Sequence, residues 1–265
     1  MDTASIIDRY ANILETLNAK TAKLQSQLPD IPCKNRCFTC CEQLFPITFL
    51  EAFYISRWIH TGMDADEKAE RTQYAQVTNE KIASALPFDY LNQHRLSEKE
   101  ALNIHALFNK GLHMIQTACP ALNTKRAKGS CTVYESRPHE CRVQGFSVNF
   151  FPESLLLETS GMQSTEVPYN KEVGGQIAGC FRFENLQHLA PKLMDYNYLY
   201  PEKLELDCAL IAELTQNYFP QKIMYYTTMC MPFLKNFEDE DWTMFFKKRI
   251  PELTEKNTCS VVVDV

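Results

Sequence analysis

Four of the chain's 11 cysteines lie within nine residues, in the string CKNRCFTCC. They are Cys33, Cys37, Cys40 and Cys41. Free cysteines are normally scattered through a protein core, so packing accounts for one or two of them but poorly for four so close together. Thiolates are soft ligands for zinc and iron, and closely spaced thiolates can converge on one ion or cluster. The spacing therefore indicates a metal site at this string.

A second group of cysteines follows in a series of short motifs. These are CPAL at Cys119, CTVY at Cys131, RP at Arg137 and CR at Cys141. Preceded by CxxxCxxCC, this order resembles a cysteine-cluster family that chelates zinc or iron, also called the YkgJ-type or CxxCxxCC proteins. The resemblance covers about residues 33–142.

The resemblance implies a metal site built from eight cysteines. Seven of them match the motif directly, and we take Cys180 as the eighth because it follows a glycine-rich tract that could bring it back to the cluster. Cys208, Cys230 and Cys259 are expected to be core or surface thiols instead. The implied ligands are Cys33, Cys37, Cys40, Cys41, Cys119, Cys131, Cys141 and Cys180.

Two arginines and one histidine stand close to these cysteines in the sequence. Four thiolates around a divalent ion leave a net charge of about -2, and Arg137 and Arg142 could offset it or donate hydrogen bonds to sulfur. We expect His139, two residues before Cys141, to be a solvated turn residue, with a metal-ligand or proton-carrying role as the alternative.

Cysteine-only ligation suits both iron and zinc. The adjacent pair Cys40 and Cys41 cannot easily aim at one point, which suits a multinuclear centre better than a single tetrahedral zinc. We therefore expect iron, held as an iron-sulfur cluster or as iron, with zinc as the alternative. The cysteines could form one centre or two adjacent ones.

The function classes compatible with such a site remain open. CxxxCxxC is also the spacing of radical-SAM enzymes, but that class predicts alternating strands and helices, and it leaves Cys41 and the second cysteine group unexplained. Flagellin lysine methylases share a similar cysteine motif, so an iron-sulfur-dependent protein-modifying enzyme is one alternative. A zinc-stabilised interaction module with a protein partner is another. No GxGxxG, HExxH or Ser-His-Asp pattern is found, so the sequence leaves enzyme status undecided.

Composition narrows the partners and the compartment. Of 265 residues, 45% are hydrophobic and 23% charged, which is ordinary for a globular protein. The net charge of -6 argues against a nucleic-acid partner. No stretch approaches the ~20 apolar residues that cross a bilayer, and the first residues do not resemble a signal peptide. Because the count of 11 cysteines is odd and no signal is recognised, we expect a cytoplasmic protein without a membrane partner.

The elements that must position the cysteines are mostly helical. A stripe of apolar residues predicts a helix over 1–29, and capping-box spacings at Thr48 and Ser97 predict helix starts within a helical insert over 48–117. Turn-prone residues predict short extended pieces near 119–151, and residues 152–265 are expected to be helical. We thus expect a single metal-binding domain over 1–265 with its cysteine-cluster core at 33–142, in a mainly α, irregular helical fold organised around a cysteine-ligated metal centre.

Overall fold

The structure is a computed structural model of the 265-residue chain. In the residues it describes, the chain is mainly helical with a few short strands, as predicted. The chain divides into two compact units. Unit 1 comprises Met1–Ala11, Phe38–Pro138 and Glu202–Val265, and unit 2 comprises Asn12–Cys37 and His139–Pro201. The residues described are 1–29, 31, 33, 38–86, 93–123, 130–152, 169–170, 175–179, 189–216, 222–239, 241–249 and 259–265.

The predicted N-terminal helix is α1, Thr3–Gln27. It begins after Asp2, whose carboxylate accepts a hydrogen bond from the Ser5 N–H at 2.7 Å. Its apolar stripe is buried, as the 3-4 spacing predicts, and the helix ends shortly before Pro29, as expected. The buried residues of this stripe include Ile6, Tyr10, Leu14, Leu17 and Leu24.

Three helices form most of the insert between the two cysteine groups. Both predicted capping boxes are present: the Glu51 carboxylate accepts from the Thr48 N–H at 2.9 Å, and the Glu100 carboxylate accepts from the Ser97 N–H at 2.7 Å. Asp64 caps the middle helix by accepting from two backbone N–H groups. The helices are α2, Phe49–Gly62; α3, Ala65–Ala85; and α5, Glu98–Met114.

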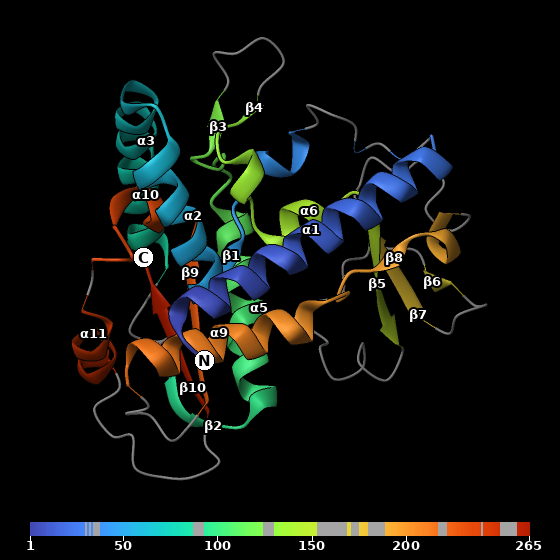
Figure 1. The fold of residues 1–265 in the computed structure, drawn as a ribbon. Coiled ribbons are helices and arrows are strands. Elements are labelled where there is room, and N and C mark those ends of the chain that lie inside the picture. Colours follow the sequence, from blue (N-terminus) through green and yellow to red (C-terminus); the bar gives the residue numbers. More distant parts are fainter. Residues whose placement is uncertain are drawn as a thin grey trace. The chain divides into compact units, whose positions relative to one another are not determined.

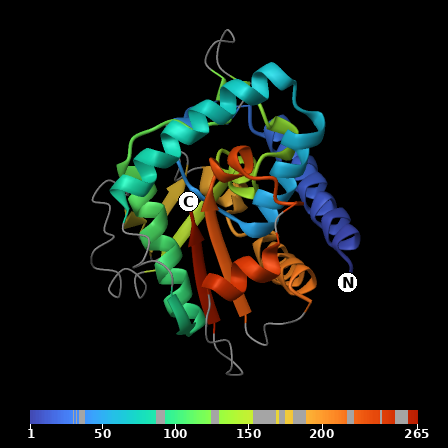
Figure 2. The same cartoon turned by 90° about the vertical axis from the view of Figure 1, so that its left-hand side faces the viewer.

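Unit 1 contains a four-stranded sheet of order β1-β9-β10-β2. Its two long strands, β9 and β10, pair in parallel and lie side by side in Figure 2, in orange and red. A parallel pair requires a crossover connection, and the short helices α10, Met231–Leu234, and α11, Trp242–Arg249, lie in it. The strands are β1, Pro46–Thr48; β2, Gln93–Leu96; β9, Lys222–Thr228; and β10, Cys259–Asp264.

The prediction that residues 152–265 are helical is therefore wrong in part. Helix α9, Tyr200–Leu214, is present, but the tract from Met224 begins as strand β9, and the C-terminal residues form β10. Strands buried on both faces read as continuous apolar runs, and periodicity alone does not distinguish such a run from a buried helix segment. Val261, Val262 and Val263 of β10, each 1% exposed, form such a run.

An aromatic cluster fills the core of unit 1. The ring of Trp242 lies 4.6 Å from that of Phe49, edge to face, and stacks on Phe237 at 4.8 Å. The Trp242 indole N–H donates to the Phe237 carbonyl at 2.7 Å, so its polar atom is satisfied although the side chain is buried. Tyr225 and Phe246 pack on the same Phe49 ring. These aromatic residues fill the core of unit 1.

Unit 2 contains a second four-stranded sheet, of order β6-β7-β5-β8, of which Figure 1 shows β5, β6 and β7 next to one another. Short helix α6, His139–Val143, leads into it. The C-terminal half of α1 belongs to this unit, in which Arg142 donates to Asn18 at 2.6 Å and Lys20 lies over the Tyr198 ring. The strands are β5, Ser147–Pro152; β6, Tyr169–Asn170; β7, Gly175–Gly179; and β8, Met194–Asp195.

A small hairpin in unit 1 supplies the extended pieces expected near 119–151, together with β5. Its strands are β3, Leu122–Asn123, and β4, Ser130–Cys131, paired antiparallel. A 3₁₀ turn over Thr39–Glu42 precedes β1. Among the helices that the structure describes, none is both long enough and apolar enough to cross a membrane.

Candidate metal centre

The predicted ligands are distributed over both units. Cys40, Cys41, Cys119 and Cys131 belong to unit 1, and Cys33 and Cys141 belong to unit 2. Cys37 and Cys180 lie outside the described residues. Within the described part of the chain, no three or more cysteine, histidine, aspartate or glutamate side chains are already arranged as a metal site.

Backbone hydrogen bonds join the three cysteine-bearing segments of unit 1. The Cys119 N–H donates to the Cys41 carbonyl at 2.7 Å, which ties CPAL to the first cysteine group. The Leu122 N–H then donates to the Cys119 carbonyl at 3.0 Å, and Leu122 pairs with Cys131 in the β3–β4 ladder. Cys41 and Cys119, 78 positions apart in sequence, are thereby held side by side through a main-chain hydrogen bond, which does not depend on a bound ion.

Cys40 and Cys41 share the 3₁₀ turn over Thr39–Glu42. A hydrogen bond from the Cys41 side chain is the main reason that the pKa of the Cys40 thiol falls to about 7, and the positive charge of Arg137 lowers it further. The Arg137 guanidinium lies 4.2 Å from the centre of the Tyr134 ring. Arg137 therefore has the electrostatic effect on a motif cysteine that its position in the sequence suggests, and Cys40 ionises more readily than an ordinary cysteine to the thiolate form that binds metals.

The thiol of Cys119 ionises less readily than that of an ordinary cysteine. Its residue is 4% exposed, and burial raises the pKa of its thiol well above the ordinary value, with the negative charges of Cys131, Cys230 and Cys40 adding to the rise. These thiols are thus close enough for their charges to oppose one another. A soft cation offsets such repulsion, since thiolates are the ligands that zinc and iron prefer. The donor set of unit 1 fits either metal.

Cys230 is a neighbour of the motif cysteines that the sequence does not reveal. It is fully buried, and burial raises the pKa of its thiol to about 12. Its N–H donates to the Thr228 hydroxyl at 3.2 Å, at the end of β9. Of the core or surface positions expected for it, Cys230 occupies a core one, and its thiolate form would raise the pKa of Cys119 although the two residues are 111 positions apart in sequence. No local motif signals such a proximity, because it arises from the sheet.

In unit 2, Cys33 packs against the chain that leaves α6, the helix that carries Cys141. A Cβ atom at Gly145 would overlap the Cys33 Cβ and lie 2.6 Å from its Sγ. Only glycine fits at this position without displacing Cys33. The requirement for glycine at 145 was not predicted, because nothing in the local sequence indicates which segment packs on it.

Two further residues of the second motif group have structural partners in unit 2. Arg142 is 2% exposed and donates to the Asn18 side chain of α1. His139 is fully buried, with its Nε2–H donating to the Tyr198 carbonyl at 2.8 Å and its ring against that of Tyr200. The expectation of a solvated turn histidine is therefore wrong. Helix α6 begins at His139 and turns its first side chain inward.

Unit 1 also buries a group of charged side chains that contains no cysteine. The Lys203 ammonium lies 3.1 Å from the Glu51 carboxylate, and both side chains are 0% exposed. Asp207, one helical turn after Lys203 on α9, accepts from the Leu50 N–H at 2.7 Å. Burial raises the pKa of Asp207 to about 7, and burial together with the charge of Lys203 lowers the pKa of His105 to about 4. Sequence reasoning missed this group because α2 and α9 lie about 150 residues apart.

Comparison with protein families supplies the class. The family model CxxCxxCC, described as "Putative zinc- or iron-chelating domain", matches residues 32–167, just over half of the chain. The chain belongs to this family, which confirms the resemblance seen in its motifs. Comparison with curated proteins gives no match, and comparison with solved structures gives none either.

Proposed function

We propose that the protein is a metal-binding protein whose site is built on the cysteines of unit 1: Cys40, Cys41, Cys119 and Cys131. The observation that carries the proposal is the 2.7 Å hydrogen bond between the Cys119 N–H and the Cys41 carbonyl. It joins the first and second cysteine groups of the motif through the main chain, and the β3–β4 pairing brings in the strand that ends in Cys131. The family's description as zinc- or iron-chelating supports the same conclusion.

The other members of the ligand set are proposed from the motif. Cys33, Cys37 and Cys141 occupy motif positions, and Cys180 is the preferred eighth ligand. The packing of Cys33 on Gly145 supports a defined place for Cys33 in unit 2. Eight thiolates exceed what one tetrahedral ion accepts, so this set fits a multinuclear centre or two centres.

We propose iron, as an iron-sulfur cluster or as iron, ahead of zinc. Cys40 and Cys41 are consecutive and share one 3₁₀ turn. Such a pair suits a centre with more than one metal atom better than a single tetrahedral zinc. A cluster would supply electron transfer or a Lewis-acidic iron; the protein's own cysteines would hold it, and Arg137 would offset part of its negative charge.

Metal analysis of protein purified without oxygen tests this proposal. Iron and zinc per chain, acid-labile sulfide and the visible absorption spectrum are measured on the same sample. Iron with matching sulfide and broad visible absorption supports a cluster, and directs further work to redox assays and to SAM-dependent protein modification. Stoichiometric zinc without sulfide supports the zinc-stabilised interaction module instead. Protein that holds neither metal, as purified and after reconstitution, contradicts the proposal.

A further inference from the structure

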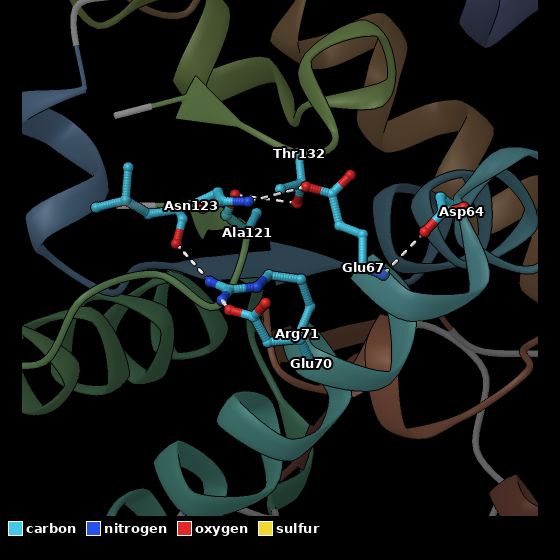
Figure 3. A network of polar contacts seen from close by, with 8 residues as sticks. Asp64, Glu67, Glu70, Arg71, Ala121, Asn123 and Thr132 are labelled. Atoms are coloured by element: carbon cyan, nitrogen blue, oxygen red, sulfur yellow. Dashed lines mark hydrogen bonds and ion pairs between the residues drawn. The ribbon is translucent and has the colours of Figure 1, made fainter. Parts of the chain in front are cut away.

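Helix α3 contacts the hairpin that carries two of the proposed ligands. Arg71 of α3 is 7% exposed, and its guanidinium Nη1 donates to the Leu122 carbonyl at 2.7 Å. The neighbouring Glu70 carboxylate pairs with the Nη2 of the same guanidinium. Figure 3 shows the Arg71 guanidinium beside the Glu70 carboxylate. A buried charged donor is thus fixed against the main chain of β3.

A second contact joins the same two elements one helical turn earlier on α3. The Asn123 side-chain amide donates to the Glu67 carboxylate at 3.0 Å, and Asn123 itself is 7% exposed. Glu67 lies in the first turn of α3, which Asp64 caps. Both residues of β3 are therefore held to α3, Leu122 by its carbonyl and Asn123 by its side chain. Figure 3 shows the Asn123 amide directed at Glu67.

The held residues lie directly beside the proposed ligands. The N–H of Leu122 donates to the Cys119 carbonyl, and Leu122 pairs with Cys131 across the hairpin. Thr132, next to Cys131, binds the residue that precedes β3. Its N–H and its hydroxyl both donate to the Ala121 carbonyl, at 2.8 Å and 3.0 Å. A displacement of β3 would therefore move the backbone of both cysteines.

We propose that Arg71 and Asn123 are positioning residues for the metal centre, through which helix α3 fixes the separation of Cys119 and Cys131. This inference rests on the proposed function. It assigns a role to α3, which lies in the helical insert between the two cysteine groups and carries no cysteine. Partners that orient metal ligands typically change metal affinity about 10- to 100-fold when they are removed.

The test compares metal loss in four variants of the full-length protein. Arg71→Met removes the donor to Leu122, Asn123→Ala removes the contact to Glu67, and Arg71→Lys keeps a positive donor. Ile82→Ala is the matched control, because Ile82 is a fully buried residue of the same helix whose truncation leaves a cavity without touching the hairpin contacts. For each protein, the rate of metal transfer to excess EDTA is measured well below its unfolding midpoint, and the midpoint is measured by circular dichroism.

Arg71→Met and Asn123→Ala are expected to lose metal about 10- to 100-fold faster than the unaltered protein. Arg71→Lys should lose it at an intermediate rate, and Ile82→Ala at the unaltered rate although its unfolding midpoint falls. The inference is overturned if Arg71→Met and Asn123→Ala keep the unaltered rate, or if Ile82→Ala accelerates metal loss as much as they do.

A Cys119→Ala variant separates failure of this inference from failure of the proposed function. If the unaltered protein and Cys119→Ala hold the same amount of metal, the proposed site is wrong and the positioning role falls with it. If Cys119→Ala loses the metal but the α3 variants release it at the unaltered rate, only the positioning role is wrong.

Discussion

Replacement of Lys203 by methionine should destabilise unit 1 strongly without touching a cysteine. The Lys203 ammonium and the Glu51 carboxylate are 3.1 Å apart, and neither side chain is exposed to solvent. Methionine keeps the unbranched apolar stem of lysine but removes the charge. Glu51 is then left buried without its positive partner. Asp207 also loses the positive charge of Lys203, which favours its ionised form.

The expected loss follows from this burial. Removal of one partner of a buried ion pair costs about 3–5 kcal/mol, because the remaining charge is uncompensated. For a chain of this size, each kcal/mol corresponds to roughly 2–4 °C in melting temperature, so the midpoint should fall by about 6–20 °C. A surface pair behaves differently. Arg57 and Glu238 are 3.6 Å apart with side chains 50% and 36% exposed, so Arg57→Met should cost less than about 1 kcal/mol.

The assay is urea unfolding followed by circular dichroism, for Lys203→Met, Arg57→Met and the double variant Lys203→Met/Glu51→Gln. Glutamine at 51 keeps an oxygen that can accept the Thr48 N–H of the capping box, but removes the stranded charge. The double variant should therefore recover most of the lost stability. If Lys203→Met is no less stable than Arg57→Met, or if the double variant recovers nothing, the reasoning from the buried pair is refuted.

Three further substitutions test other parts of the structure. Burial raises the pKa of Asp207 from 3.8 to about 7, so its ionisation opposes folding, and stability should fall as the pH rises from about 4 to about 7. Asp207→Asn should flatten this fall in melting temperature with pH. An equal dependence of melting temperature on pH in the two proteins would contradict the prediction. Gly145→Ala places a Cβ against Cys33 and should cost about 1–3 kcal/mol in the free energy of unfolding. It should also release metal to EDTA faster. Unchanged stability would show that Cys33 does not pack on Gly145. His139→Phe removes the donor to the Tyr198 carbonyl, a part-buried hydrogen bond, and should cost about 0.5–1.5 kcal/mol in the free energy of unfolding while metal per chain stays the same. Loss of metal without loss of stability would instead make His139 a ligand.

The parts of the fold that follow from local physics could be predicted from the sequence. The starts of α2 and α5 were predictable because a capping box needs only residues three positions apart, Thr48 with Glu51 and Ser97 with Glu100. The end of α1 was predictable from Pro29. Strands β9 and β10 were not, because their apolar runs are equally compatible with a buried helix segment.

The candidate site shows the same division. The identity of the motif cysteines is readable from spacing, since the order of the short motifs is itself the signal. The contacts that hold the site could not be read from spacing, because Arg71 and Leu122 lie 51 residues apart and meet only where α3 packs on the hairpin. Long-range polar contacts of this kind leave no periodic trace in the sequence, and neither does the proximity of Cys230 to Cys119.

The most direct test of the central claim is the metal content of the double variant Cys119→Ala/Cys131→Ala, compared with Cys208→Ala. Cys208 is a half-buried cysteine of unit 1 whose Sγ faces the Ile223 carbonyl, outside the motif, so its removal controls for the loss of a thiol. All proteins are purified without oxygen, and iron and zinc per chain are measured. We predict that the double variant loses most of its metal and that Cys208→Ala keeps the full amount. Full metal retention in the double variant would contradict the assignment of the site.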